Sequence, residues 1–426
     1  MATTESEGAR VPSRLTRILT IVGPGILIAA TGVGAGDLAL AAISGSRLGL
    51  AILWAVLLGA AIKFVLTEGL ARYQLATGQT LLEGAMKRLG WTARVIFGAY
   101  LLLWSFFVAN SLLSGCGIAM HAIFPVFDDA STGQVVFGVA HSFVALLLVR
   151  VGGFGLFEKI MGVCIGIMFA VVVTTAILLR PDPVELMQGL FKPSIPQWRE
   201  SGLQWTVALM GGVGGTLTVL CYGYWIREKG REGVGYLTTC RIDLAVGYLM
   251  TAIFGVAMVV IGSHIEIEGN GAGLIVALAD QLSEPLGSAG RWAFLIGAWG
   301  AIFSSLLGVW QAVPYVFADY LRLLSKDASK ASQPVSESSR SYRGYLWALA
   351  VIPLIGLHMP FKEIQKVYAI FGAAFMPLLA IALLIMNGRR DWVGDLRNRW
   401  YTTLALLSTI IFFGVVGFYG LRNKFG

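Results

Sequence analysis

Residues 28–40 read IAATGVGAGDLAL and lie inside an apolar run that extends from residue 18 almost to residue 47. Glycine stands at three alternate positions of this stretch (Gly32, Gly34 and Gly36), and the carboxylate of Asp37 follows directly. Glycine weakens a helix and permits non-helical backbone angles, while a carboxylate is costly in hydrocarbon. We therefore expect this helix to be broken here, because a membrane tolerates unpaired backbone groups only where they line a cavity or bind something.

The composition of the chain indicates a helical membrane protein with many spans. Of its 426 residues, 56% are hydrophobic and only 13% are charged, which is far less charge than a soluble domain of this size carries. The net charge of +8 is explained by basic loops on the inner side of a membrane, and nucleic-acid binding is not expected. The four cysteines form no CxxC pair, so we expect no disulfide framework, no zinc site and no cofactor.

Eleven apolar segments are long enough to be spans, and the first needs its extra length only if it is broken in the middle. Their approximate bounds are 18–46, 48–71, 93–120, 133–149, 156–180, 204–226, 242–263, 289–320, 344–358, 363–387 and 401–421. Lysine and arginine gather in alternate connecting segments, whereas segment 124–134 has neither. By the positive-inside rule, this predicts a cytoplasmic N-terminus and an external C-terminus for a multi-pass protein of the plasma (inner) membrane.

Three polar segments flank or join these spans. Residues 1–17 predict a cytosolic tail, and the Ser/Lys-rich segment 325–342 predicts a flexible cytoplasmic loop. Segment 181–203 is a candidate cap for the outer mouth of the protein. We expect no separate soluble domain.

A second glycine cluster lies in span six, where residues 209–225 read LMGGVGGTLTVLCYGYW. It follows the first cluster by five spans, and because five is odd, a five-span repeat would be inserted in inverted orientation. Paired glycine-interrupted helices in corresponding positions of two inverted halves are the best sequence indication of a transporter binding site. Close helix packing is the alternative explanation for each cluster taken alone.

The scaffold around both clusters resembles the Nramp family of divalent metal transporters. The resemblance rests on GPGILIAATGVGAGDL (23–38), LGLAILWAVLL (48–58), LARYQLATGQTLLEG (70–84), FSSLLGVWQAVPYVFADYL (303–321) and FGAAFMPLLAIALLIMNGRRDWVGDLRNRW (371–400). It implies an all-α membrane protein of the LeuT-type fold, with two inverted five-helix repeats and one extra helix. The repeats then cover residues 18–180 and 204–387, and residues 401–421 form the extra helix.

The family's ligands are not all present at the corresponding positions. The family's DPGN motif falls on residues 34–37, so that its aspartate corresponds to Gly34 and its asparagine to Asp37. Its span-six MPH motif falls on residues 216–218, where this chain has Thr216 and Thr218. The family's span-ten glutamine corresponds to Gly372, and the acidic residues of its span-three proton path correspond to Ala109 and Leu112. The resemblance thus implies an altered site that lacks the family's usual proton coupling.

We expect the altered site to be built from oxygen ligands. Asp37 is the candidate metal ligand, together with Thr216, and the alternative for Asp37 is a helix N-cap. The full expected binding set is Thr31, Gly34, Asp37, Gly212, Gly215, Thr216 and Thr218. Candidate pathway or gate residues are Glu68, Asn110, Tyr222 and Gln311, although Glu68 also has Arg72 four residues away as a structural ion-pair partner.

The loss of a thioether ligand and the retention of oxygen favour hard cations, so the expected cargo is Mg²⁺ or Mn²⁺. A single carboxylate is a small number of charged ligands for a dehydrated divalent ion. The alternative is therefore a transporter of a small organic solute coupled to Na⁺ or H⁺. An enzyme is not expected, because the chain has neither HExxH nor GxSxG. The expected partners are the cargo cation and the lipid bilayer, with no required protein partner.

Overall fold

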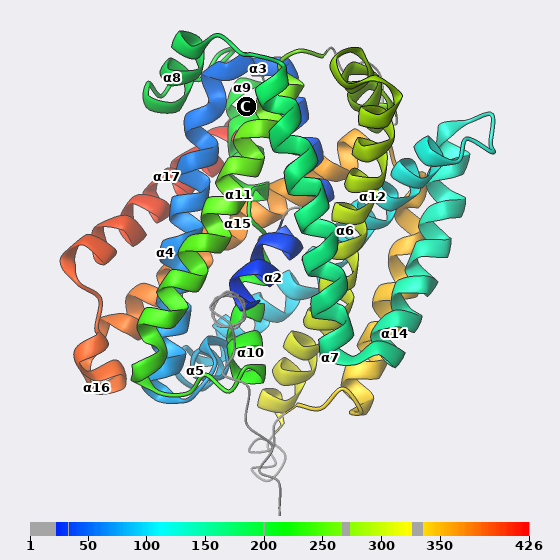
Figure 1. The fold of residues 1–426 in the computed structure, drawn as a ribbon. Coiled ribbons are helices and arrows are strands. Elements are labelled where there is room, and N and C mark those ends of the chain that lie inside the picture. Colours follow the sequence, from blue (N-terminus) through cyan, green and yellow to red (C-terminus); the bar gives the residue numbers. More distant parts are fainter. Residues whose placement is uncertain (1–22, 33, 199–200, 266–272, 326–334, 426) are drawn as a thin grey trace, which may run out of the picture.

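The computed structural model describes residues 23–32, 34–198, 201–265, 273–325 and 335–425, and within these residues every regular element is a helix (Figure 1). In this part of the chain, eight helices are long and apolar enough to cross a membrane. They are Asp37–Thr77, Gly90–Ile123, Ala130–Gly152, Gly202–Glu228, Val234–Gly262, Gly287–Leu324, Phe361–Gly388 and Trp400–Gly417. The all-α membrane fold expected from the sequence is therefore confirmed.

The other three expected spans are short or interrupted. The fifth corresponds to Gly162–Leu178, a shorter apolar stretch at the end of α7 (Ala130–Leu178). The ninth is divided between α14 (Arg340–Val351) and the 3-10 helix η4 (Ile352–His358), whose Pro353 cannot donate a backbone hydrogen bond. The first is the broken helix discussed next.

Span one is interrupted where its glycines predicted. Helix α2 (Gly23–Gly32) ends before Gly34, whose backbone angles are φ −119° and ψ −152°, and α3 (Ala35–Leu48) begins after it. Span six is interrupted in the same way between α9 (Gly202–Gly212) and a second half made of η2 (Leu217–Leu220) and α10 (Cys221–Glu228). Both expected breaks are thus present.

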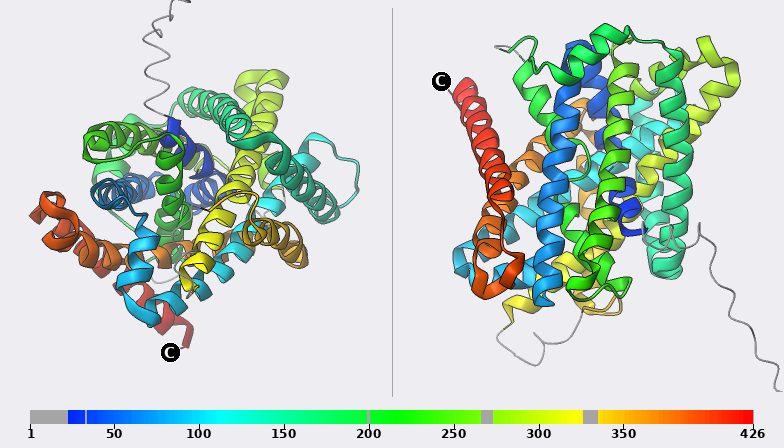
Figure 2. Two further views of the ribbon diagram at one scale, coloured as in Figure 1. Left: turned by 90° about the horizontal axis from the view of Figure 1, so that it is seen from below. Right: turned by 60° about the vertical axis from the view of Figure 1, so that its left-hand side comes forward.

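The half-helices lie inside a ring of longer helices. Figure 1 shows α2 and α10 in the middle of the bundle, with α4 (Leu53–Thr77), α6 (Gly90–Ile123), α11 (Leu237–Gly262) and α12 (Leu274–Leu324) around them. Helix α15 (Phe361–Gly388) crosses behind, and α17 (Trp400–Phe425) stands at the edge of the bundle (Figure 2). The half-helices therefore pack against the inward faces of the longer helices, α2 against α11 and α12, and α10 against α4.

The two ends of the bundle carry different short helices. One end, here called the α5 end, carries α5 (Leu81–Arg88) and α16 (Arg390–Val393), and α10 points toward it (Figure 1). Helix α5 begins with a capping box, in which Thr80 Oγ1 accepts from the Glu83 amide and the Glu83 carboxylate accepts from the Thr80 amide. The opposite end, the α8 end, carries α8 (Pro183–Phe191).

Helix α8 belongs to the segment expected to cap the outer mouth. Its Gly189 lies so close to the Leu50 carbonyl that an added Cβ would be 2.1 Å from that oxygen. Beyond α8, the Ser194 carbonyl accepts a 2.9 Å hydrogen bond from Trp54 Nε1. This segment therefore covers the start of α4. The expected tail 1–17 and half of the expected loop 325–342, residues 326–334, lie outside the described residues.

Candidate functional site

The breaks of spans one and six meet at the centre of the bundle. A Cβ added to Gly32 would lie 2.7 Å from the Gly214 carbonyl carbon, so two backbones are in contact with no side chain between them. Gly214 and Gly215 have φ values of +79° and +80°, a region that residues with a Cβ rarely adopt. Gly32 is required because the two backbones touch there, and Gly214 and Gly215 are required because their φ values are positive. Ordinary helix packing is therefore not the only reason for these glycines.

Asp37 joins the two breaks. Its side chain is fully buried, and its carboxylate oxygens accept from the Gly214 amide at 3.0 and 3.1 Å. It is not the N-cap of α3, because that position is Gly34 and Asp37 lies in the first turn of the helix. The alternative that Asp37 is the N-cap is therefore wrong. Its negative charge, however, still complements the N-terminal end of the helix dipole of α3.

Lys63 is the site residue that the sequence analysis missed. It lies on α4 with its side chain fully buried, and its Nζ donates to the Gly211 carbonyl at 2.9 Å and to the Val213 carbonyl. These carbonyls belong to the C-terminal end of α9, where the helix dipole is negative and carbonyl groups lack helical partners. The available signal was a lone lysine inside the apolar stretch LGAAIKFVL (58–66).

A single peptide unit lies between these two charges. The carbonyl of Val213 accepts from Lys63, and the amide of Gly214, on the other side of the same peptide bond, donates to Asp37. The peptide dipole points its negative end at the ammonium and its positive end at the carboxylate. Each charge is therefore compensated through the backbone of span six.

Thr216 and Thr218 are both buried near the break, but they have different surroundings. Thr216 Oγ1 accepts a 2.7 Å hydrogen bond from Trp104 Nε1 of α6, and its methyl group faces Gly372. A Cβ on Gly372 would lie 2.3 Å from that methyl group, so α15 has no room for a larger side chain here. Thr218 Oγ1 lies against Gly215.

The remaining residues of the expected binding set contribute mainly backbone. The Thr31 hydroxyl donates to the Leu27 carbonyl of its own helix at 2.6 Å, so that hydroxyl group is used within α2. Gly212 lies against Leu40 of α3, and a Cβ there would be 2.4 Å from Leu40 Cδ1. Gly34 lies between Ser305 of α12 and Leu112 of α6.

The space beside Gly34 is filled by Ser305. A Cβ at position 34 would lie 2.3 Å from Ser305 Oγ and 2.6 Å from its Cβ. We expect Gly34→Ala to lower the free energy of unfolding by roughly 1–3 kcal/mol, because a well-packed interior does not accept an added methyl group without strain. A thermal denaturation series in detergent checks this, with Ser305→Gly as the companion change. The explanation fails if the double variant is no more stable than Gly34→Ala alone.

The structure separates the four expected pathway or gate residues. Asn110 Nδ2 donates to the Pro353 carbonyl of η4 at 3.0 Å and Tyr222 donates to Asp243 at 2.9 Å, so both tie helices together. Glu68 pairs with Arg72 at 3.3 Å, as expected, and also with Arg241 of α11 at 2.7 Å. Glu68 lines a pocket with Arg72 and Arg241, and Gln311 lines a second pocket.

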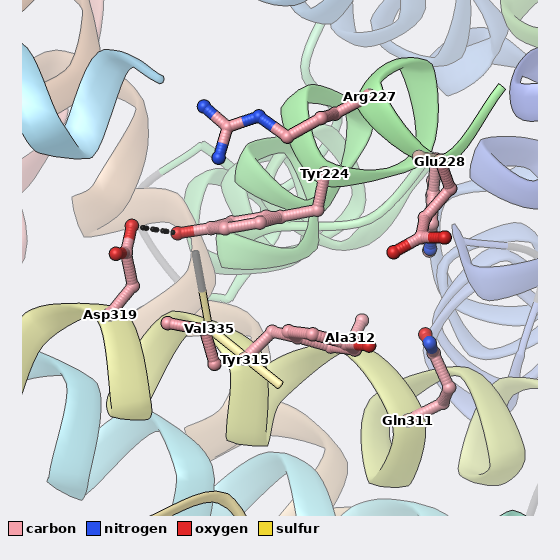
Figure 3. Close-up of a pocket in the computed structure, with 9 residues that line it drawn as sticks. Tyr224, Arg227, Glu228, Gln311, Ala312, Tyr315, Asp319 and Val335 are labelled. Carbon is pink, nitrogen blue, oxygen red and sulfur yellow. Dashed lines mark hydrogen bonds between the residues drawn. The ribbon is translucent and has the colours of Figure 1, made fainter. Parts of the chain in front are cut away.

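The pocket lined by Gln311 lies near the α5 end between α10 and α12 and has a volume of about 70 Å³. Figure 3 shows Gln311 and Glu228 on opposite walls, with the Tyr224 hydroxyl donating to Asp319 at 2.8 Å. Gln311 Oε1 is buried and has no hydrogen-bond partner within the described part of the chain. The pocket therefore has polar side chains on both walls, and it is too small to be an open channel.

Ion pairs close the α5 end next to this pocket. Glu83 of α5 pairs with Arg322 of α12 at 2.7 Å and with Arg227 of α10 at 3.3 Å, and Arg322 also pairs with Asp319 at 2.6 Å. One carboxylate thus holds α5, α10 and α12 together. These ion pairs, here called the Glu83 cluster, are formed by Glu83, Arg227, Asp319 and Arg322.

We expect Glu83→Gln to loosen the Glu83 cluster, because the neutral amide weakens the charge-assisted hydrogen bonds to Arg322 and Arg227. Amide hydrogen exchange of α10 should become faster by about 10-fold, the factor that corresponds to ~1.4 kcal/mol. Asp395→Asn, which removes an exposed pair with Arg390, is the matched control and should leave α10 unchanged. Equal exchange in both variants would show that Glu83 does not hold α10.

The groups at the breaks that could bind a metal ion are oxygen atoms, because the Lys63 ammonium nitrogen has no free electron pair. Among the described residues, no group of three or more His, Cys, Asp or Glu side chains is close enough together to hold a metal ion. A cation at the breaks would therefore depend on Asp37 and on backbone carbonyls. Such a site suits ions that prefer oxygen and keep part of their water.

Known protein families and proteins are similar to this chain in sequence. The sequence profile of the family described as natural resistance-associated macrophage protein-like matches residues 25–422. A Pseudomonas aeruginosa protein named divalent metal cation transporter MntH 1 is 24% identical over 92% of this chain and 89% of its own length. A Bacillus subtilis protein named divalent metal cation transporter MntH is 22% identical over 92% of this chain and 90% of its own.

Solved structures agree in fold. A mutant of the Eremococcus coleocola manganese transporter matches with a TM-score of 0.70 at 15% identity, over 96% of this chain and 88% of that one. The structure of MhsT in complex with L-phenylalanine matches with a TM-score of 0.65 at 17% identity, over 97% and 99%. At these identities the similarity establishes the fold alone.

Proposed function

This chain belongs to the natural resistance-associated macrophage protein (Nramp) family, and from that premise we propose that it transports a divalent metal cation across a membrane by alternating access. The proposed cargo is Mg²⁺ or Mn²⁺, bound between the broken helices of spans one and six. The observation that carries this proposal is the buried Asp37 carboxylate, which lies where the two breaks touch. The names of the Pseudomonas and Bacillus relatives agree with a divalent cation as cargo.

The proposed ligands are the carbonyl oxygens of Gly211 and Val213, which would bind the ion directly, and the Asp37 carboxylate, which lies across the Val213–Gly214 peptide and would act through a water that the ion keeps. All are hard oxygen donors, and Mg²⁺ and Mn²⁺ bind such donors while keeping coordinated water. Thr216 is a weaker candidate, since its hydroxyl oxygen already accepts a hydrogen bond from Trp104. Thr31 is excluded from the proposal, because its hydroxyl donates within α2.

We further propose that transport is driven by the membrane potential and not by protons. The positions that correspond to the family's span-three acids are Ala109 and Leu112, which are buried and cannot carry a proton. The distribution of basic residues supports an inner-membrane protein with the N-terminus in the cytoplasm and the C-terminus outside. In that orientation the α5 end faces the cytoplasm and the Glu83 cluster is the inner gate.

Lys63 also favours a second candidate function. Its ammonium and the Asp37 carboxylate make the centre of the bundle neutral in the absence of any cargo, which suits a small organic solute better than a doubly charged ion. The MhsT structure with L-phenylalanine is an example of an organic solute on this fold. We therefore keep a small organic solute coupled to Na⁺ or H⁺ as the alternative.

Uptake into proteoliposomes of the purified protein tests these proposals. We expect Mn²⁺ and Mg²⁺ to accumulate when the interior is negative, without acidification reported by an internal pH-sensitive dye. Asp129→Asn, which removes an exposed carboxylate at the start of α7, is the control and should transport normally. Absence of both cations from the lumen, together with Na⁺-dependent uptake from a labelled amino-acid mixture, would reject the metal and favour the organic solute.

A further inference from the structure

We propose that Lys63 is a tethered cation that competes with the cargo: its ammonium occupies the carbonyls of Gly211 and Val213 whenever no cargo cation is bound there. This inference rests on the proposed function, because it concerns the same site. It assigns to one lysine the control of when, and how tightly, the site accepts a cation.

The first support is the position of the ammonium group. Lys63 reaches from α4 to the C-terminal end of α9 and donates to two carbonyls there. Carbonyl oxygens at the end of a broken membrane helix are the groups that bind cations in such folds. The lysine thus fills a cation site with a covalently attached cation.

The second support is charge. Asp37 is the carboxylate that contacts the break of span six, and it lies across the Val213–Gly214 peptide from the ammonium. One carboxylate balances one ammonium, but it cannot also balance a divalent ion in a buried region. Cargo binding therefore requires Lys63 to withdraw from these carbonyls.

The third support is the length of the side chain. Four methylene groups separate the ammonium from the backbone of α4, and the stem passes Gly214, where an added Cβ would lie 3.5 Å from Lys63 Cδ. We expect withdrawal to occur by rotation about the bonds of this stem.

Binding of Mn²⁺ to Lys63→Met tests the competition directly. Methionine keeps the apolar length of the side chain but removes the charge, which leaves the two carbonyls free and the charge of Asp37 unbalanced. Equilibrium dialysis should give Mn²⁺ binding at least ~10-fold tighter than in the unmodified chain. Lys63→Arg is the matched control, since it keeps the charge and should bind no more tightly than the unmodified chain. The inference is overturned if methionine and arginine give the same Mn²⁺ affinity.

Chemical rescue tests, without any metal, whether the carbonyls of Gly211 and Val213 form a cradle for an ammonium group. Lys63→Ala should lower the thermal unfolding midpoint, and ethylammonium chloride should restore part of the loss by filling the vacated cradle, whereas sodium chloride at the same concentration should not. A midpoint that responds equally to both salts would overturn the inference.

These outcomes distinguish the inference from the proposed function. If ethylammonium restores stability while the unmodified chain carries no metal, the tethered cation is supported and the metal cargo is rejected. If metal is transported but Lys63→Met binds it no more tightly, the metal cargo stands and the tethered cation is rejected.

Discussion

Replacement of Asp37 by asparagine is expected to abolish cation uptake and to lower the free energy of unfolding by about 3 kcal/mol, the typical loss when a buried charge loses its partner. Asparagine has nearly the same shape, and its side-chain oxygen can still accept from the Gly214 amide. The loss would therefore come from charge: the buried Lys63 ammonium would keep its two carbonyls but lose the carboxylate across the peptide.

The double variant Asp37→Asn/Lys63→Met separates the two effects. It removes both charges, so we expect stability to return to within about 1 kcal/mol of the unmodified chain, while uptake stays absent. Unfolding in detergent gives the stability and proteoliposome uptake gives the function. Normal uptake by Asp37→Asn would show that this carboxylate is not a ligand, and a double variant as unstable as the single one would show that the charges are not coupled.

Replacement of Arg231 by methionine is the second large effect, with an expected destabilisation of about 3–5 kcal/mol. Arg231 and Asp243 form a 2.9 Å ion pair in which the side chains are 4% and 0% exposed, so the loss of the arginine leaves a buried carboxylate with less compensation. Asp243 also accepts from the Gly25 amide at 2.7 Å. The pair therefore fixes the start of α2, the first half of the broken helix.

Two controls make this prediction specific. Arg390→Met removes an arginine whose partner Asp395 is 90% exposed, and it should change stability by less than about 0.5 kcal/mol. Arg231→Met/Asp243→Asn should recover part of the loss, because it also removes the isolated charge. Similar unfolding midpoints for Arg231→Met and Arg390→Met would contradict the buried-pair explanation.

The fold and the broken helices follow from local sequence. Hydropathy fixes the spans because the bilayer sets the length of each apolar segment, and clustered glycines weaken a helix wherever they occur. The position of Asp37 could be predicted for the same reason, since it directly follows the glycines of span one. The Glu68–Arg72 pair also follows from spacing along one helix, and it is confirmed.

The partners of the other charged and polar residues depend on tertiary contacts and could not be predicted. Lys63 contacts Gly211 and Val213, which are about 150 positions away in the chain. Asp243 of α11 pairs with Arg231, which lies in the segment between α10 and α11. Asn110, expected on the pathway, bonds to η4 instead. Helical periodicity in the sequence does not show which residues of different helices contact one another.

The peptide between Val213 and Gly214 has a consequence for how the residues at positions 37 and 63 vary among related proteins. Its two ends serve Lys63 and Asp37 at once, so mutation of either residue leaves one end of the same peptide facing an unsuitable neighbour. Natural relatives should therefore gain or lose these two residues together, with glycine retained at the position of Gly214. Covariation of a span-two lysine with a carboxylate at the position of Asp37 would then identify, from sequence alone, which branches of the family share this centre.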